Sequence, residues 1–278
     1  MTTTHQDEVN AGRRFEFGKN WTAFLSVLDE DRIRIAEESL KTLLGESSLS
    51  GQRFLDIGSG SGLFSLCARR LGADVVSMDY DPKSVACTRE LKRRYFPEDP
   101  CWAVHEGSVL DESFMERLGS FGIVYSWGVL HHTGRMMDAL EAAGRRVRAP
   151  GGKLAIAIYN DQGAWSRRWR AIKKMYCANR VSRALVTALG CSYFALQGAK
   201  EDLLQMRNPL ARYGEYRRNR GMAIWTDWID WLGGLPFEVA KPEVLFDFYA
   251  ARGFRLIRLT TCGGSLGNNE FVFVREHD

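Results

Sequence analysis

The chain has 278 residues, of which 45% are hydrophobic and 26% charged, as in a globular protein with one domain and an insertion. Its formal net charge of +4 is too small to indicate a nucleic-acid partner. The polar start of the chain lacks an apolar signal core, and no stretch approaches the roughly 18 apolar residues of a membrane span, so we expect a cytoplasmic protein without a membrane partner.

The six cysteines are scattered and form no C-x-x-C pair, which favours reduced thiols over a disulfide framework or a zinc site. Two of the five histidines, His5 and His277, lie near the ends of the sequence. A metal site needs three or four ligands, so we expect no metal cofactor.

The first segment, residues 1–30, contains an unusually aromatic stretch, Phe15–Trp21 (FEFGKNW), with no strand period. We interpret residues 1–30 as a lid in which Phe17 and Trp21 cover a bound ligand. Packing of the same aromatic residues against the core is an equally good interpretation.

Residues 31–160 alternate between helical and strand patterns. A helix is predicted over Asp31–Leu44, another from Pro82, where Asp81 is the expected cap, and a third from Thr133 to Arg148. The predicted strands are Arg53–Ile57, Ala73–Met78, Trp102–His105, Ile123–Trp127 and Leu154–Tyr159. This alternation is typical of a parallel sheet that is covered by helices on both faces.

The stretch FLDIGSGSG, residues 54–62, joins the first strand to a helix. Glycines 58, 60 and 62 permit positive φ and close approach of a ligand to the backbone, and Asp56 places a carboxylate beside it. A dinucleotide fingerprint is the nearest alternative, but its third glycine would fall at Leu63. An ordinary glycine-rich turn is the other alternative.

Acidic and polar residues follow the next two strands. Asp79 ends the second strand, where a carboxylate can accept both ribose hydroxyls of a nucleoside, and Tyr80 could pack on the ribose or adenine. Ser108 and Val109 follow the third strand, and Asp111 in the same loop is an alternative helix cap. These positions predict a nucleoside site at the carboxyl edge of the sheet.

The glycine motif, Asp79, the loop at Gly107, the segment SWGVLHHTG (126–134) and the APGG before the fifth strand occur in one order along the chain. Together they resemble the class I S-adenosylmethionine (AdoMet) methyltransferases. The resemblance implies a Rossmann-like three-layer sandwich with a seven-stranded, mostly parallel sheet. It also implies a set of AdoMet-binding residues: Trp21, Asp56, Gly58, Ser59, Gly60, Asp79, Tyr80, Ser108, Val109, Trp127 and Gly128.

The catalytic candidates lie beyond the fourth and fifth strands. His131 could remove a proton from an acceptor, although it and His132 cannot both point toward the site. Asn160 or Tyr159, at the end of the fifth strand, could touch the substrate, and Tyr176 and Asn160 are candidates for contacts to the sulfonium.

Residues 161–240 interrupt the alternation with helical, aromatic and basic sequence, and residues 241–278 resume it with a helix and two final strands. We interpret residues 161–240 as a helical substrate lid, and residues 31–160 with 241–278 as the AdoMet-binding core. The aromatic and basic residues around Trp165–Tyr176 could form an RNA patch, but an amphipathic helix with a solvated basic face explains them more simply.

Three functions fit these observations. The first is methyl transfer to a small-molecule acceptor of the secondary-metabolite type. The second is cyclisation of AdoMet by its own amine, giving azetidine-2-carboxylate and 5′-methylthioadenosine, as in a related branch with the same fold. The third is an AdoMet-binding regulatory module, which the intact glycine motif argues against. The sequence leaves the acceptor and the oligomeric state open.

Overall fold

The computed structural model describes residues 4–209, 211–213, 224–264 and 267–277. Within these ranges, seven strands form one sheet in the order β3-β2-β1-β4-β5-β7-β6. The first five strands are parallel, and β7 runs antiparallel to both β5 and β6. Their bounds are Arg53–Ile57, Asp74–Asp79, Trp102–Glu106, Ile123–Trp127, Lys153–Tyr159, Phe254–Thr260 and Asn268–Arg275 for β1 to β7.

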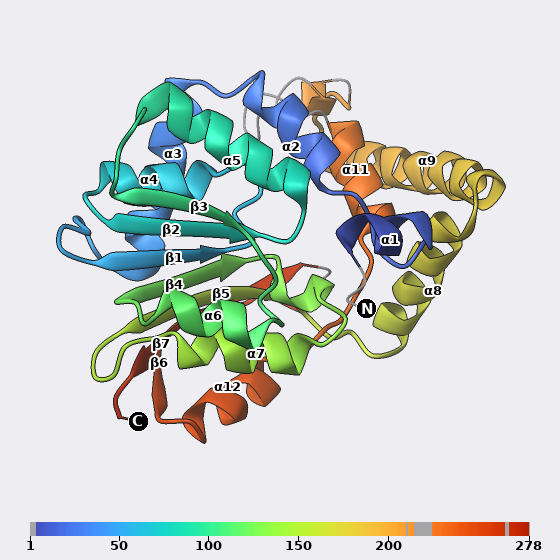
Figure 1. Cartoon of the computed structure of the whole chain (residues 1–278). Coiled ribbons are helices and arrows are strands. Elements are labelled where there is room, and N and C mark those ends of the chain that lie inside the picture. The colour runs from blue at the N-terminus through green and yellow to red at the C-terminus, as the bar shows by residue number, and fades with distance from the viewer. Residues whose placement is uncertain (1–3, 210, 214–223, 265–266, 278) are drawn as a thin grey trace.

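Helices cover both faces of the sheet, as Figure 1 shows. One face carries α3 (Glu30–Leu44), α4 (Leu63–Arg70) and α5 (Pro82–Tyr95). The other carries α6 (Glu112–Leu118), α7 (Met136–Arg145) and α12 (Pro242–Ala250). The predicted three-layer fold with a mostly parallel seven-stranded sheet is therefore confirmed.

The core consists of two apolar layers because alternate residues of each strand point to opposite faces. In β1, Phe54 packs with the layer under α3 and α4, whereas Leu55 and Ile57 pack with the layer under α7 and α12. All three are almost fully buried. Burial on both faces explains the nearly continuous apolar sequence of the central strands.

Helix starts were predicted with mixed success. Asp81 caps α5 as expected, its carboxylate accepting from the Lys83 N–H at 2.9 Å. The predicted helix from Thr133 to Arg148 is too long, because a short 3-10 turn, Leu130–His132, comes first and α7 begins only at Met136. The Thr133 hydroxyl donates backward to the Leu130 carbonyl at 2.7 Å instead of capping α7.

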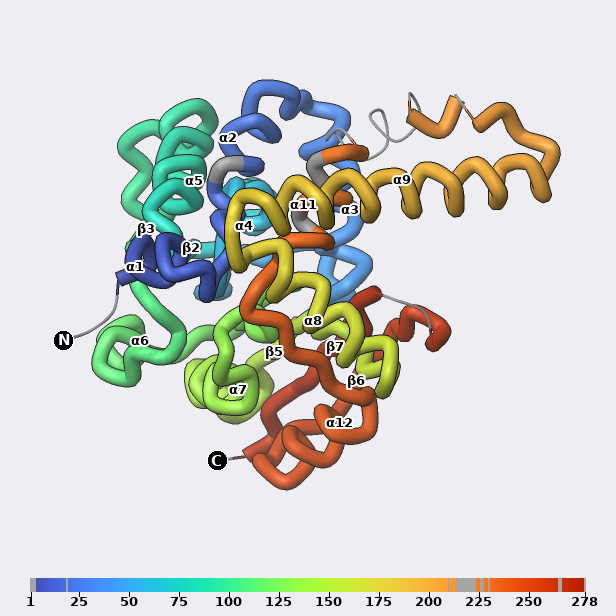
Figure 2. Tube along the Cα trace, turned by 90° about the vertical axis from the view of Figure 1, so that its right-hand side faces the viewer, coloured from blue at the N-terminus to red at the C-terminus, as the bar shows by residue number. Residues whose placement is uncertain are grey.

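Further helices gather where the parallel strands end. They are α1 (His5–Asn10), α2 (Gly18–Leu25), α8 (Ala164–Ala178), α9 (Arg180–Leu204) and α11 (Ile224–Gly233). α8, α9 and α11 share an apolar cluster that includes Trp169, Val186 and Leu232, and α9 extends away from the sheet (Figures 1 and 2). None of the helices in the described ranges is both long and apolar enough to cross a membrane.

Candidate active site

A cavity of about 1000 Å³ opens at the carboxyl edge of the sheet. Its floor is formed by the loops after β1, β2, β3 and β4, and aromatic residues of the N-terminal segment and α11 line its other side. The structure brings all of the expected AdoMet-binding residues to its wall: Trp21, Asp56, Gly58, Ser59, Gly60, Asp79, Tyr80, Ser108, Val109, Trp127 and Gly128.

The glycine loop after β1 has backbone geometry that other residues rarely adopt. Gly58 has a φ of 80° and Gly60 a φ of 55°. A Cβ atom on Gly58 would clash with the Val129 side chain, and one on Gly60 would lie 2.9 Å from the Trp21 indole. The loop therefore needs glycine both for its positive φ and for room beside its neighbours.

Asp79 is held at the end of β2 by backbone donors. Its two carboxylate oxygens accept from the Gly60 N–H and the Asp81 N–H, each at 2.9 Å. Burial raises the pKa of Asp79 to about 6, although these N–H groups act in the opposite direction. A ligand with hydroxyl or cationic groups at this position would stabilise the carboxylate.

Asp56 ends a buried chain of hydrogen bonds that begins at the indole of Trp102 in β3. The Trp102 indole N–H donates to Ser77 Oγ at 2.8 Å, Ser77 to Ser65 Oγ at 2.6 Å, and Ser65 to Asp56 Oδ2 at 2.5 Å. Burial, together with the nearby Asp79 carboxylate, raises the pKa of Asp56 to about 7. The donors fix the carboxylate in place on the cavity wall while burial leaves it poorly solvated.

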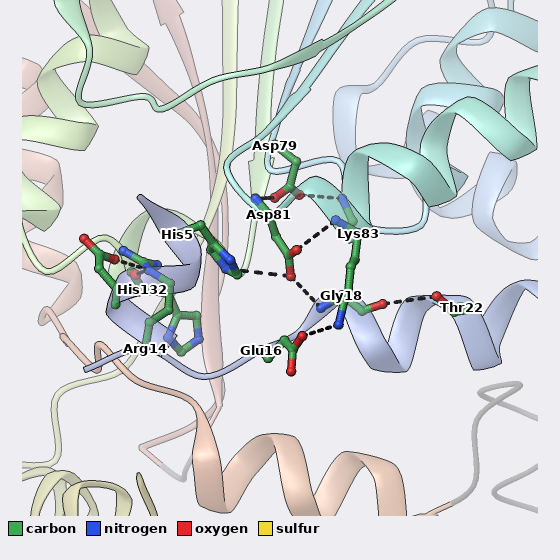
Figure 3. A network of polar contacts seen from close by, with 11 residues as sticks. His5, Arg14, Glu16, Gly18, Thr22, Asp79, Asp81, Lys83 and His132 are labelled. Carbon is green, nitrogen blue, oxygen red and sulfur yellow. Dashed lines mark hydrogen bonds and ion pairs between the residues drawn. The ribbon is translucent and has the colours of Figure 1, made fainter. Parts of the chain in front are cut away.

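The N-terminal segment is bound to the loop that carries Asp79, as Figure 3 shows. Asp81 Oδ2 accepts from the Gly18 N–H at 2.9 Å and lies 3.7 Å from His5 Nε2. Arg14 Nη1 donates to the His132 carbonyl at 2.9 Å on the opposite side of the cavity mouth. The segment therefore spans the cavity and is fixed at both sides.

Comparisons with known proteins agree with this arrangement. Residues 55–156 match the family model described as a methyltransferase domain. The chain contains a class I AdoMet-dependent methyltransferase domain. The match begins in β1 and ends in β5, so it includes the glycine loop, Asp79 and the adjacent His131 and His132.

Curated relatives match part of the chain. The tRNA U34 carboxymethyltransferase of Azotobacter vinelandii is 38% identical over 39% of this chain and 33% of its own length. The ubiquinone biosynthesis O-methyltransferase of Xanthomonas oryzae pv. oryzae is 31% identical over 40% of this chain and 45% of its own length. The matches thus span less than half of these relatives.

Solved structures share the fold over more of the chain. An O-methyltransferase family protein from Burkholderia thailandensis superposes with a TM-score of 0.57 and 12% identity, covering 100% of this chain and 64% of that one. The magnesium protoporphyrin IX methyltransferase of Synechocystis PCC 6803, solved with bound S-adenosylhomocysteine, gives a TM-score of 0.51 and 12% identity over 88% and 84% of the two chains. At this identity the likeness shows the fold alone.

Only one histidine of the domain's His-His pair lines the cavity, and it is His132 rather than the expected His131. The Pro236 carbonyl lies 2.6 Å from His132 Nδ1, so this nitrogen donates and Nε2 carries the lone pair of the neutral ring. Burial lowers the pKa of His132 to about 3, which keeps the ring neutral at physiological pH.

The three expected catalytic residues lie behind the cavity wall. His131 is fully buried, packs on the Tyr159 ring at 4.0 Å and accepts from the Tyr159 N–H at 3.3 Å. Asn160 accepts from the Asn269 amide at 3.1 Å, and Tyr176 packs against Phe15 in the cluster under α8 and α9. In the described structure these residues support the wall from behind.

Several cavity residues carry no sequence motif. Tyr159 at the end of β5 and Trp231 of α11 meet edge to face at 5.3 Å. Glu270 of β7 accepts from the Trp127 indole N–H at 2.9 Å, and it lines the cavity with Trp228. Tyr159 was a candidate because of its position at a strand end, and the tryptophan density near residue 228 indicated a lid. Glu270 had no signal in the sequence.

Proposed function

We propose that this enzyme binds AdoMet along the strand edge and transfers its methyl group to a small-molecule acceptor held beneath the aromatic residues. The observation that carries the proposal is the continuity of the cavity. It runs from the two carboxylates of the floor to the aromatic side chains of α2 and α11.

AdoMet fits the floor of the cavity by its chemistry. The glycine loop lines the cavity at the end of β1, and Asp79 presents a poorly solvated carboxylate to ribose hydroxyls. Ser108 and Val109 then lie at the adenine end, and Asp56, Trp127 and Gly128 at the methionyl end. When bound, AdoMet supplies an activated methyl group, so the protein chiefly aligns the acceptor.

The acceptor region is enclosed and mostly aromatic. Phe17, Trp228, Trp231 and Tyr159 line it, and aromatic faces stabilise a neighbouring sulfonium. At about 1000 Å³ the whole cavity lies at the upper end of the volumes typical of small-ligand sites, enough for AdoMet and a small second substrate. We infer that His132, which lines the cavity, accepts a hydrogen bond from the acceptor through Nε2. A small molecule suits such an enclosed space better than an RNA chain.

The same enclosure favours a second candidate, cyclisation of AdoMet without an acceptor. In that reaction the amine of the aminobutyrate arm forms a bond to the carbon beside sulfur, the carbon–sulfur bond breaks, and 5′-methylthioadenosine leaves. Desolvation by aromatic walls would keep the amine neutral and reactive. The Tyr176 ring, expected as one of these walls, lies outside the cavity lining.

Incubation of the purified chain with AdoMet alone, followed by mass analysis, separates the two reactions. Methyl transfer predicts no turnover until an acceptor is supplied, and then S-adenosylhomocysteine. Rapid formation of 5′-methylthioadenosine without acceptor would instead establish cyclisation. A chain that binds AdoMet but yields neither product with a panel of hydroxyl and amine acceptors would contradict both.

A further inference from the structure

Helix α9 is apolar on both of its sides, which is unusual for a helix on the surface. Residues 184–199 contain no charged side chain. One side packs on the body of the protein, where Phe194 stacks on Trp169 at 6.0 Å and Gly190 leaves room for Leu232. A helix that is hydrophobic all round is normally buried on all sides.

The other side of α9 lies open. Five aliphatic residues that recur along this side are between 56% and 80% exposed: Val181, Leu185, Leu189, Leu196 and Leu203. We call these five the α9 stripe. Tyr193 lies on the same side and is about half exposed. Figure 2 shows the C-terminal half of α9 running outward beyond the other helices.

We propose that the α9 stripe packs against the α9 stripe of a second copy, in antiparallel orientation. The stripe and its apolar neighbours expose on the order of 500 Å² per copy, a large part of the roughly 800 Å² that each partner buries in a standard interface. A single patch of this size is at the upper end of what monomers expose.

The helix dipole selects the antiparallel orientation, because a parallel pair would place like helix ends side by side, which is repulsive. Ser192 lies midway between Val181 and Leu203, the two ends of the stripe. A twofold axis near Ser192 therefore brings the whole of each α9 stripe onto the other. The twofold arrangement also closes on itself and leaves no second stripe exposed.

The pairing would support the active site because α9 also packs against α11, which carries Trp228 and Trp231. The dimer would hold these side chains over the acceptor region. This consequence rests on the proposed function, whereas the dimer itself does not.

Sedimentation velocity of the full chain between about 1 and 100 µM tests the proposal. The wild-type chain is expected to dimerise within this range. The double variant L189E/L196E should weaken dimerisation at least about a hundredfold, since it places unpaired charge in the interface. Met137→Glu, at a residue of α7 that is 39% exposed, is the matched control and should leave the dimer intact. Circular dichroism checks that each variant is folded.

Cross-linking tests the orientation. Ser192→Cys should form an intermolecular disulfide under mild oxidation because the two copies of residue 192 lie at the axis, whereas Ser48→Cys, exposed and remote, should not. A wild-type chain that stays monomeric at about 100 µM would overturn the proposal. Binding of the stripe to phosphatidylserine vesicles without dimerisation would also overturn it and would assign α9 to a lipid surface.

Discussion

The floor and the aromatic side of the cavity are built in different ways. The floor consists of loops that each directly follow a strand, so short motifs bring Asp56, Gly60 and Asp79 together once the sheet forms. The opposite side joins α2 to α11, which are separated by about two hundred residues and placed by side-chain packing. The proposed AdoMet site is therefore defined by local sequence, whereas the proposed acceptor region is defined by tertiary contacts.

The largest expected effect is the loss of stability on substituting a glycine in the floor of the cavity. Gly58→Ala should lower the free energy of unfolding by roughly 2–4 kcal/mol, because it adds backbone strain and a clash with Val129. Gly151→Ala is the matched control, since Gly151 has a φ of 87° but no neighbouring atom within 4 Å of the place that a Cβ would occupy. Urea unfolding measures both. Equal losses in the two variants would mean that the crowding around Gly58 is unimportant.

A pH experiment tests whether burial dominates the carboxylates of the floor. Because burial raises the pKa of Asp56 to about 7, the ligand-free folded chain holds a proton that the unfolded chain releases near pH 4. Stability from this group is present at low pH and is lost as the pH rises through 7. Asp56→Asn keeps the acceptor for Ser65 and should flatten this dependence by on the order of 2 kcal/mol.

Urea unfolding of the wild-type chain and Asp56→Asn at several pH values between about 5 and 8 provides the measurement. A difference between the two that stays constant over this range would show that Asp56 is already ionised in the folded chain. Asp56 could then no longer be counted as a floor carboxylate whose pKa is raised by burial.

A smaller effect is expected where the N-terminal segment is bound to the floor of the cavity, at Asp81. Asp81→Asn keeps the cap of α5, since asparagine caps as well as aspartate, but it loses the charge that faces Gly18 and His5. We expect about 1 kcal/mol of local destabilisation, seen as faster hydrogen exchange over residues 5–24. Asp111→Asn at the cap of α6 is the control, because the hydrogen bonds of Asp111 go to its own helix start. Unchanged exchange in Asp81→Asn would show that packing alone holds the segment.

The smallest effect is expected on AdoMet affinity when a residue of the proposed acceptor region is substituted. Trp231→Phe removes the indole N–H but keeps an aromatic ring beside Tyr159, so AdoMet affinity should change by less than about 0.5 kcal/mol. Calorimetric titration of the variant measures this. If Trp231→Phe weakened AdoMet affinity as much as a substitution in the floor, AdoMet would not be bound by the floor alone, as proposed.

The sequence predicted the strands closely because buried parallel strands carry a continuous apolar pattern, and it placed the AdoMet-binding residues at the cavity because most of them follow such a strand. It could not decide between His131 and His132, since the choice depends on a 3-10 turn and on the Pro236 carbonyl. Asn160 and Tyr176 were expected at the cavity from position alone. In the structure, Asn160 is hydrogen-bonded to Asn269 and Tyr176 packs against Phe15, and neither side chain lines the cavity.

The most direct test of the account is calorimetric titration of the purified chain with AdoMet and with S-adenosylhomocysteine, beside Asp79→Ala. We predict one site per chain, with affinity weakened by about 1–3 kcal/mol in the variant through the loss of charge-assisted hydrogen bonds to the ribose. Equal affinity of the wild-type chain and Asp79→Ala would contradict the placement of AdoMet on the floor of the cavity.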